Sequence, residues 1–218
     1  MSNQRTIAFF GATGSTGKEF LKLALKENYI VKALVRTPEK LKITDSNLTV
    51  IKGDLSNEKA ISKVVENADN IICMVSSLKS PQKDLMHNFI KLLHPIMLKN
   101  KLATLTYMAG ALCYAPNKKK SKRVAFMRNT LGKITRVETS IADHDKVMQY
   151  VHQRMLPDNL KVFVTLPGGL GLTAGPSKKE LKVYEKTVLK SSKFIDVAEF
   201  TLKNMDNPDC FGRYLYVA

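Results

Sequence analysis

Three glycines spaced three residues apart lie near the N-terminus, directly after an apolar run. They are Gly11, Gly14 and Gly17, and they follow residues 7–10 (IAFF). A turn of this kind needs a residue that tolerates positive φ, and small residues let the backbone approach a bulky anion. The helix expected to begin near Ser15 would offer free N–H groups and the positive end of its dipole. The pattern therefore predicts a diphosphate-binding turn between a strand and a helix.

A cation stands where the second predicted strand, 29–35, ends. Proteins that bind NAD through such a turn usually carry an acidic residue at this point, which holds the ribose 2′-hydroxyl. This chain carries Arg36 there, with Lys40 and Lys42 close behind. A guanidinium can pair with a 2′-phosphate, so the expected cofactor is NADP(H). The alternative is that Arg36 is a solvated loop cation.

Strands and amphipathic helices alternate along most of the chain. We expect further strands over 48–52, 70–75, 102–108, 160–166, 183–189 and 213–217, and helices near 57–65, 81–96, 141–154 and 195–205. Ser56 is expected to cap the helix that follows it, and Pro95 predicts a kink or an early end of its helix. The alternation predicts an α/β fold with a doubly wound, mostly parallel sheet and helices on both faces.

Length and composition indicate one ordinary globular unit. The 218 residues suit a single NAD(P)-binding domain over 1–218, with a basic loop over about 109–139 and a small substrate-side region over about 167–218. No apolar run reaches the length of a membrane span, and the N-terminus has no signal-peptide core. The three cysteines are far apart and predict neither a disulfide framework nor a metal site. These features predict that the protein is located in the cytoplasm.

Charge is distributed unevenly. The 35 Lys and Arg against 19 Asp and Glu give a formal net charge of +16. Residues 118–136 contain no acid but eight cations, namely Lys118, Lys119, Lys120, Lys122, Arg123, Arg128, Lys133 and Arg136. Such a run can attract nucleic acid, an anionic membrane face or an anionic small molecule, or it can be a solvated surface. Nucleic acid is not favoured, because aromatic stacking platforms and a recognisable nucleic-acid fold are missing.

Several local patterns together resemble a known family. The patterns 11–17 (GATGSTG), 34–36 (LVR) and 53–55 (GDL) resemble the atypical short-chain dehydrogenase/reductases with an NAD(P)-binding Rossmann domain. Among these, the likeness is to the small group that contains the NmrA-like proteins and biliverdin reductase B, a flavin reductase. The likeness extends to 142–144 (ADH) and 192–198 (SKFIDVA).

The resemblance implies which residues would meet the cofactor at the carboxyl edge of the sheet. The pyrophosphate would be surrounded by Gly11, Thr13, Gly14, Ser15, Thr16 and Gly17, and Arg36 would meet the 2′-phosphate. Asp54 and Leu55 would border the adenine, and Val75, Ser76 and Ser77 the ribose and nicotinamide. Met108, Ala109, Leu166, Pro167 and Gly168 would flank the nicotinamide. No metal is expected.

His144 is the one histidine with a candidate catalytic role, since it would begin a helix that borders the predicted pocket. The alternative is a helix-start residue exposed to solvent. Its neighbours Asp143 and Asp145 are expected to be capping or first-turn acids.

The proton-donor set of the carbonyl-reducing family members is not matched. Those enzymes use a Ser together with Tyr-x-x-x-Lys on a helix. Tyr114 and Lys118 have that spacing, but Pro116 between them argues against a continuous helix. The serine that the biliverdin reductase B group carries after its fifth strand falls on Ala109. This chain therefore departs from the family at the residues that donate protons.

Two functions remain open. The first is an NADPH-dependent oxidoreductase that transfers hydride to a flavin, quinone or tetrapyrrole-like acceptor, where the protein mainly holds two rings in contact. The second is a non-catalytic NADP(H)-binding redox sensor of the NmrA-like type, with a protein or nucleic-acid partner. The reductase of a small, anionic aromatic acceptor is the preferred hypothesis, because one open cleft leaves little partner surface.

Overall fold

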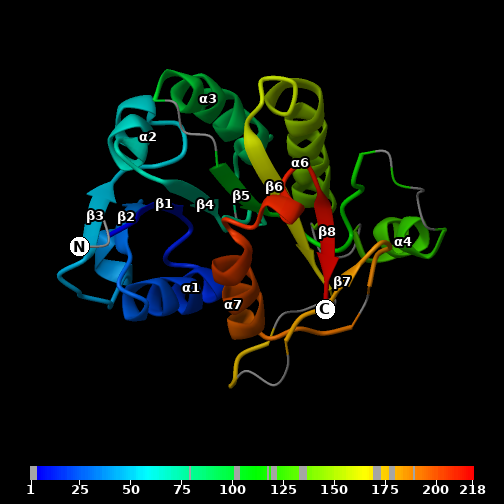
Figure 1. The fold of residues 1–218 in the computed structure, drawn as a ribbon. Coiled ribbons are helices and arrows are strands. Elements are labelled where there is room, and N and C mark those ends of the chain that lie inside the picture. The colour runs from blue at the N-terminus through cyan, green and yellow to red at the C-terminus, as the bar shows by residue number, and fades with distance from the viewer. Residues whose placement is uncertain are drawn as a thin grey trace.

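A mostly parallel sheet forms the centre of the molecule (Figure 1). The computed structural model describes residues 4–78, 80–100, 104–116, 118, 122–132, 137–168, 173–176, 180–188 and 190–218. Within these, the strands are β1 (Thr6–Phe10), β2 (Ile30–Val35), β3 (Leu48–Lys52), β4 (Asn70–Cys73), β5 (Thr104–Met108), β6 (Lys161–Pro167), β7 (Val183–Tyr184) and β8 (Tyr214–Val217). Their order is β3-β2-β1-β4-β5-β6-β8-β7, and the described pairs are parallel except β7–β8. The predicted doubly wound α/β fold is confirmed.

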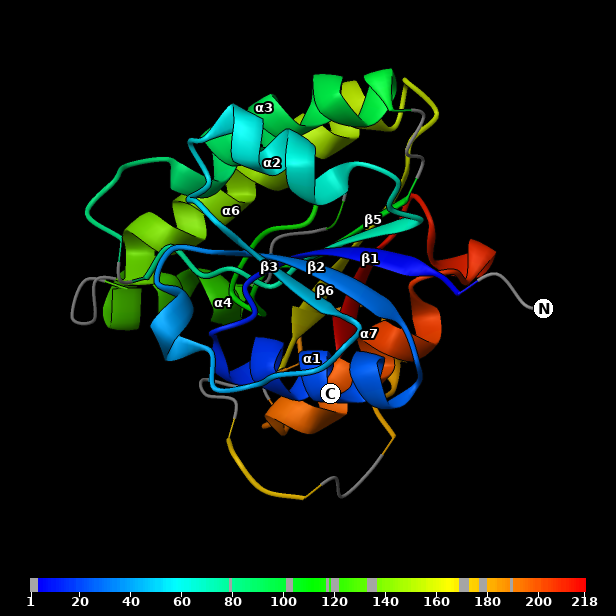
Figure 2. The same ribbon diagram turned by 90° about the vertical axis from the view of Figure 1, so that its left-hand side faces the viewer.

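Helices cover both faces of this sheet. They are α1 (Ser15–Lys26), α2 (Glu58–Val65), α3 (Leu85–Lys99), α4 (Lys122–Met127), α6 (Val137–Tyr150) and α7 (Phe194–Asn204). Short 3₁₀ turns occupy Pro38–Lys40 and Pro208–Cys210, and π-helical turns occupy Arg128–Gly132 and Val151–Met155. Helices α2, α3 and α6 lie on one face and α1 and α7 on the other, as both ribbon views show (Figures 1 and 2).

The continuous apolar run in β1 reflects burial on both faces of the sheet. Phe10 points toward α3, where its ring centroid lies 4.8 Å from that of Phe89. Phe9 points toward α1, and its ring centroid lies 5.0 Å from that of Phe20. All four side chains are fully buried, so neither face of β1 can carry a polar residue without loss.

The chain changes direction within the sheet between β1 and β4. From β1 it moves outward through β2 to β3, and it then returns to β4 on the other side of β1. The connections that follow β1 and β4 lead to α1 and α3 on opposite faces of the sheet, which opens a crevice between the adjacent carboxyl ends of these two strands. The fold thus places a ligand site where the glycine turn follows β1.

Two helix ends differ from what the sequence predicts. Helix α3 begins at Leu85 and runs through Pro95 to Lys99, so of the kink or early end expected at Pro95, the early end does not occur. Proline removes one backbone hydrogen bond, but the buried side chains of Ile96 and Met97 hold the last turn against the core.

The N-cap of α2 is Asn57 rather than Ser56. The Asn57 Oδ1 atom accepts from the N–H of Ala60 at 3.0 Å. Ser56 instead donates its N–H and its hydroxyl to Asp54 Oδ1, at 2.8 and 2.6 Å. The carboxylate of Asp54 is the better acceptor, so it binds Ser56 within the preceding turn and leaves the cap to Asn57.

A polar cluster joins the start of β1 to β4 and to the end of α7. Arg5 donates to Asn70 Oδ1 at 2.7 Å and to Asp206 Oδ1 at 2.6 Å. Asn70 also donates to Asp206 Oδ1 at 2.9 Å. Desolvation acts to raise the pKa of Asp206, but the hydrogen bonds from Arg5 and Asn70 outweigh it and lower that pKa. The charged carboxylate therefore stabilises the folded chain.

We expect the substitution Asp206→Asn to reduce the free energy of unfolding by about 1 kcal/mol at neutral pH, since the paired side chains are 41% and 40% exposed. The lowered pKa confers stability above the unfolded value of about 3.9, and this stability is lost as pH falls through the folded value. Urea unfolding of both proteins from neutral to acid pH measures the difference. The exposed Asp209→Asn is the control, and a difference independent of pH would contradict the interpretation.

Candidate functional site

Backbone packing explains two of the three glycines in the turn after β1. Gly11 has φ +112°, and a Cβ added there would lie 2.6 Å from the carbonyl oxygen of Met74. A Cβ on Gly17 would lie 2.0 Å from the carbonyl oxygen of Gly11. Gly14 is less constrained, because its φ is −74° and the nearest atom to an added Cβ is 3.3 Å away. The turn therefore lies directly against the backbone that follows β4.

Helix α1 begins in this turn without a side-chain cap. Its N-cap is Gly14, and its first turn contains no acidic residue. The N–H groups of Ser15, Thr16 and Gly17 precede the first intrahelical bond, which Lys18 N–H donates to the Gly14 carbonyl at 2.9 Å. Uncapped N–H groups at a helix start favour an anion, so this end of α1 fits a phosphate group.

A cavity of about 660 Å³ extends from this turn along the carboxyl ends of β2, β3 and β4. Seven of the residues predicted to meet the cofactor line it, namely Gly11, Thr13, Arg36, Asp54, Leu55, Val75 and Ser76. Small-molecule sites usually measure about 300–1,000 Å³, so the volume suits a nucleotide. Further lining residues that the sequence analysis did not assign are Lys18, Thr37, Glu39, Ser80, Pro81, Gln82 and Leu85. Lys18 directly follows Gly17, and this position after the glycine turn could have indicated that it lines the cavity.

Cations outnumber acids along this cavity. The cationic lining residues are Lys18, Arg36, Lys40 and Lys42, and the acidic ones are Glu39 and Asp54. Arg36 is exposed, and no carboxylate in the described part of the chain forms an ion pair with it. Hydrogen bonds from Ser56, with a smaller contribution from the charge of Arg36, lower the pKa of Asp54. The net positive lining suits a phosphorylated ligand.

The residues predicted to flank the nicotinamide lie at the ends of β5 and β6 and do not line this cavity. Leu166 is fully buried in the core beside α6, Met108 ends β5 and Ala109 follows it. A Cβ on Gly168 would lie 2.8 Å from the Lys190 carbonyl oxygen. Ser77 is also buried, with its hydroxyl 2.9 Å from that of Ser140 on α6. Their contact with a nicotinamide ring stays a prediction.

His144 lies inside α6 rather than at its start. Because α6 begins at Val137, His144 is about two turns into the helix and only 7% exposed, so the exposed helix-start alternative is wrong. Burial lowers its pKa to about 4, and burial raises the pKa of Tyr107 well above its ordinary value. The neutral Tyr107 hydroxyl can therefore donate to Nδ1 of the neutral imidazole across a distance of 2.6 Å. This contact holds α6 against β5.

The two aspartates beside His144 stabilise other elements. Asp143 accepts from the N–H groups of Met86 and His87 at 2.9 Å, so it caps α3 from the middle of α6. Asp145 accepts from the N–H of Tyr114 at 2.7 Å and pairs with Arg128. Asp143 is therefore a capping acid, as expected, although of α3 and not of the helix that contains it, and Asp145 lies beyond the first turn of α6. Through Asp143, α6 fixes the start of α3, where Leu85 lines the cavity.

The segment with Tyr-x-x-x-Lys spacing is not helical in its described residues. The ring of Tyr114 lies 4.2 Å from the guanidinium carbon of Arg128, and Lys118 pairs with Glu185 beyond β7. Each residue thus has a structural partner of its own. The prediction that this spacing is not a catalytic Tyr-Lys pair agrees with that geometry.

The sheet, the glycine turn and the cavity together define a nucleotide-binding protein of the Rossmann type. The chain matches the model of the NAD(P)H-binding family over residues 11–208 and belongs to that family. The resemblance to NAD(P)-binding Rossmann proteins of the NmrA-like, atypical short-chain dehydrogenase/reductase kind is confirmed. No curated protein sequence matches the chain.

Solved structures with the same fold include several proteins from bacteria. The oxidoreductase ylbE from Lactococcus lactis shares 20% identity and a TM-score of 0.72, covering 97% of this chain and 90% of its own. ChuY from Escherichia coli, described as an anaerobillin reductase, shares 17% identity and a TM-score of 0.76, covering 98% and 96%. A Rossmann-fold NAD(P)-binding family protein from Shigella flexneri shares 14% identity and a TM-score of 0.70, covering 99% and 94%. At these identities the similarity shows the fold alone.

Two further predictions concern features outside the cavity. Among the described residues, no helix is both long and apolar enough to cross a membrane. Cys73, Cys113 and Cys210 are free and buried, and burial raises the pKa of the Cys73 and Cys113 thiols to about 12. Cys73 lies in the core, where it is fully buried.

We expect His144 to make the wild-type protein less stable as pH falls from about 6.5 to about 4. In that range the unfolded imidazole takes up a proton that the buried one does not, so acid favours unfolding. His144→Gln removes the imidazole and with it this proton uptake. The difference in free energy of unfolding between the two proteins should therefore change by about 2–3 kcal/mol across the range. Urea unfolding at several pH values measures it. Parallel pH profiles for the two proteins would contradict the burial of a neutral imidazole.

Proposed function

We propose that this protein is an NADPH-dependent oxidoreductase that transfers hydride to a small, anionic aromatic acceptor of the flavin, quinone or tetrapyrrole type. The observation that carries the proposal is one cavity that joins the uncapped start of α1 to Arg36, Lys40 and Lys42. An NADP molecule carries a diphosphate and a 2′-phosphate, and the cavity offers binding groups for both. The reductase and oxidoreductase names of ChuY and ylbE support the same class.

Each part of the cavity has a role in binding the dinucleotide. The first-turn N–H groups of α1, with the hydroxyl of Thr13, would hold the diphosphate. Arg36 would pair with the 2′-phosphate, and Lys40 and Lys42 would add charge at the same end. Leu34 and Leu55 give this polar cavity an apolar wall for the adenine, and Val75 would border the ribose and nicotinamide. When bound, the reduced nicotinamide supplies the hydride, and the carboxyl ends of β5 and β6 would orient that ring.

The chain provides no evident proton donor of the Tyr-x-x-x-Lys type in its described residues. The buried Tyr107 and His144 are both neutral and bonded to each other. Reduction of a simple carbonyl needs a positioned acid for the developing alkoxide. Flavins, quinones and extended tetrapyrroles delocalise the incoming charge and can take protons from water. A site without a positioned acid therefore favours a conjugated acceptor over a simple carbonyl.

A non-catalytic NADP(H)-binding sensor is the second candidate, and the same missing proton donors favour it. The two functions differ in turnover. We expect NADPH to be oxidised when FMN, a short-chain quinone or biliverdin is added to the purified protein, as measured by the loss of nicotinamide absorbance. Saturable NADPH binding with no oxidation by any of these acceptors would support the sensor instead.

The free, buried cysteines favour a reducing compartment, so we place either function in the cytoplasm.

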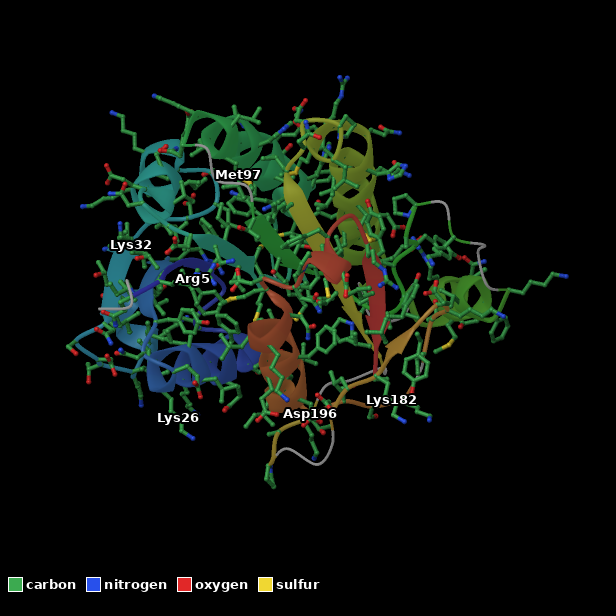
Figure 3. The ribbon with its side chains drawn as sticks, viewed as in Figure 1. Arg5, Lys26, Lys32, Met97, Lys182 and Asp196 are labelled. Carbon is green, nitrogen blue, oxygen red and sulfur yellow. The ribbon has the colours of Figure 1, made fainter. Side chains whose placement is uncertain are left out.

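We expect Arg36→Ala to weaken NADPH binding about 10- to 100-fold, because a charge-assisted phosphate contact is lost. NADH has no 2′-phosphate, and its dissociation constant should change about twofold or less. Fluorescence titration of both cofactors measures the effect without any acceptor. Lys26→Ala is the control, since Lys26 ends α1 and points away from the sheet (Figure 3). Equal weakening of NADPH and NADH would contradict the role of Arg36.

A further inference from the structure

The basic segment 118–136 has no part in the cofactor cavity. Its eight cations are accompanied by no acidic residue, yet none of its described residues lines that cavity. Figure 1 shows α4, which this segment contains, at the margin of the molecule beyond the β8–β7 end of the sheet. The cavity lies instead around β1, β2 and β4. Attraction of an anion by this segment therefore concerns a different surface from the nucleotide site.

Ion pairs to the body of the protein hold this segment at two points. Lys118, before α4, pairs with Glu185, and Arg213 approaches the same carboxylate at 3.5 Å. Arg128, directly after α4, lies 2.8 Å from Asp145 on α6 and also donates to the Leu112 carbonyl oxygen. These two ion pairs lie on either side of α4 in the sequence.

The outer face of α4 combines a cation with a large apolar side chain. Val124 is 2% exposed and packs inward, whereas Phe126 is 68% exposed. Lys122 is also exposed and lies four residues before Phe126, so both occupy one face of the helix. No ion pair of Lys122 is found in the part of the chain that the structure describes. An exposed phenylalanine gains free energy when a partner covers it.

We propose that α4, which presents Lys122 and Phe126 on one face and belongs to a segment with eight cations and no acid in its sequence, docks on an anionic lipid surface. Lysine and arginine side chains are attracted to phosphate headgroups, and a phenylalanine ring can enter the boundary between headgroups and acyl chains. Single-stranded nucleic acid fits less well, because the segment has one aromatic residue and mixes its cations with Val124, Ala125, Met127, Leu131 and Ile134. The proposal is independent of the cofactor and of the acceptor.

The test is cosedimentation of the purified chain with vesicles that contain about one-third phosphatidylglycerol, compared with vesicles of phosphatidylcholine alone. We expect binding to the anionic vesicles only, and weaker binding as salt rises. Lys122→Glu should weaken it about thirtyfold, because two units of charge change near the surface. Phe126→Ser should weaken it about tenfold or more, because the apolar insertion is lost.

Matched controls separate this surface from the charge of the whole protein. Lys26→Glu makes the same charge change at the end of α1, and Val50→Ser removes a half-exposed apolar side chain from β3. Both controls should bind vesicles within about twofold of the wild type. Urea unfolding checks that each variant is folded, as expected for substitutions of exposed residues.

Three outcomes would overturn the proposal. The first is equal binding to anionic and neutral vesicles, or none to either. The second is equal weakening by Lys122→Glu and Lys26→Glu, with no effect of Phe126→Ser, since that result reports net charge alone. The third is binding of single-stranded nucleic acid, or self-association in solution, that Phe126→Ser abolishes while vesicle binding stays unchanged.

Discussion

The whole site depends on one close approach of backbone to backbone at the point where the sheet changes direction. The turn after β1 lies so near the carbonyl of Met74 and folds so tightly on itself that Gly11 and Gly17 leave no space for a side chain. This contact sets the start of α1 against the ends of β1 and β4. The N–H groups of α1, the crevice and the cationic lining then meet in one place. If the turn were displaced, the N–H groups of α1 would no longer lie beside the crevice and its cationic lining.

Helix α6 organises the other half of the molecule through three consecutive residues. Asp143 caps α3, His144 bonds to Tyr107 on β5, and Asp145 holds the segment that leads to α4. Each contact satisfies a polar group that the fold has buried or brought close to the core. Because α3 begins at the cavity wall and α4 at the outer surface, one helix fixes both. The contacts of residues 143–145 therefore join elements of the fold, and a catalytic role for His144 stays a prediction.

Charge separates the surface into two regions. One lies in the cavity, where cations from α1 and from the segment after β2 face inward. The other is the segment around α4, whose Lys122 and Phe126 face outward on a single helix face. The cationic lining of the cavity suits a phosphorylated nucleotide, and the segment around α4 is the one proposed to dock on an anionic lipid surface.

Local pattern was sufficient for most strands, the glycine turn and the position of Arg36, because apolar period, turn chemistry and strand ends are all short-range properties. The strand expected over 183–189 is an exception, since β7 covers Val183–Tyr184 and residues 185–188 are not part of a strand. Local pattern did not predict that Ser56 binds Asp54 and leaves the cap to another residue, that Asp143 caps α3, or that α3 continues past Pro95 to Lys99. These features depend on residues that compete with the expected partner or lie far along the chain. His144 shows the limit most clearly: only the packing of α6 on β5 buries its ring and holds it neutral. The sequence alone determined which backbone could hold a diphosphate. Tertiary structure decided which charged and polar groups line the cavity beside that backbone, because burial and distance are properties of the packed chain.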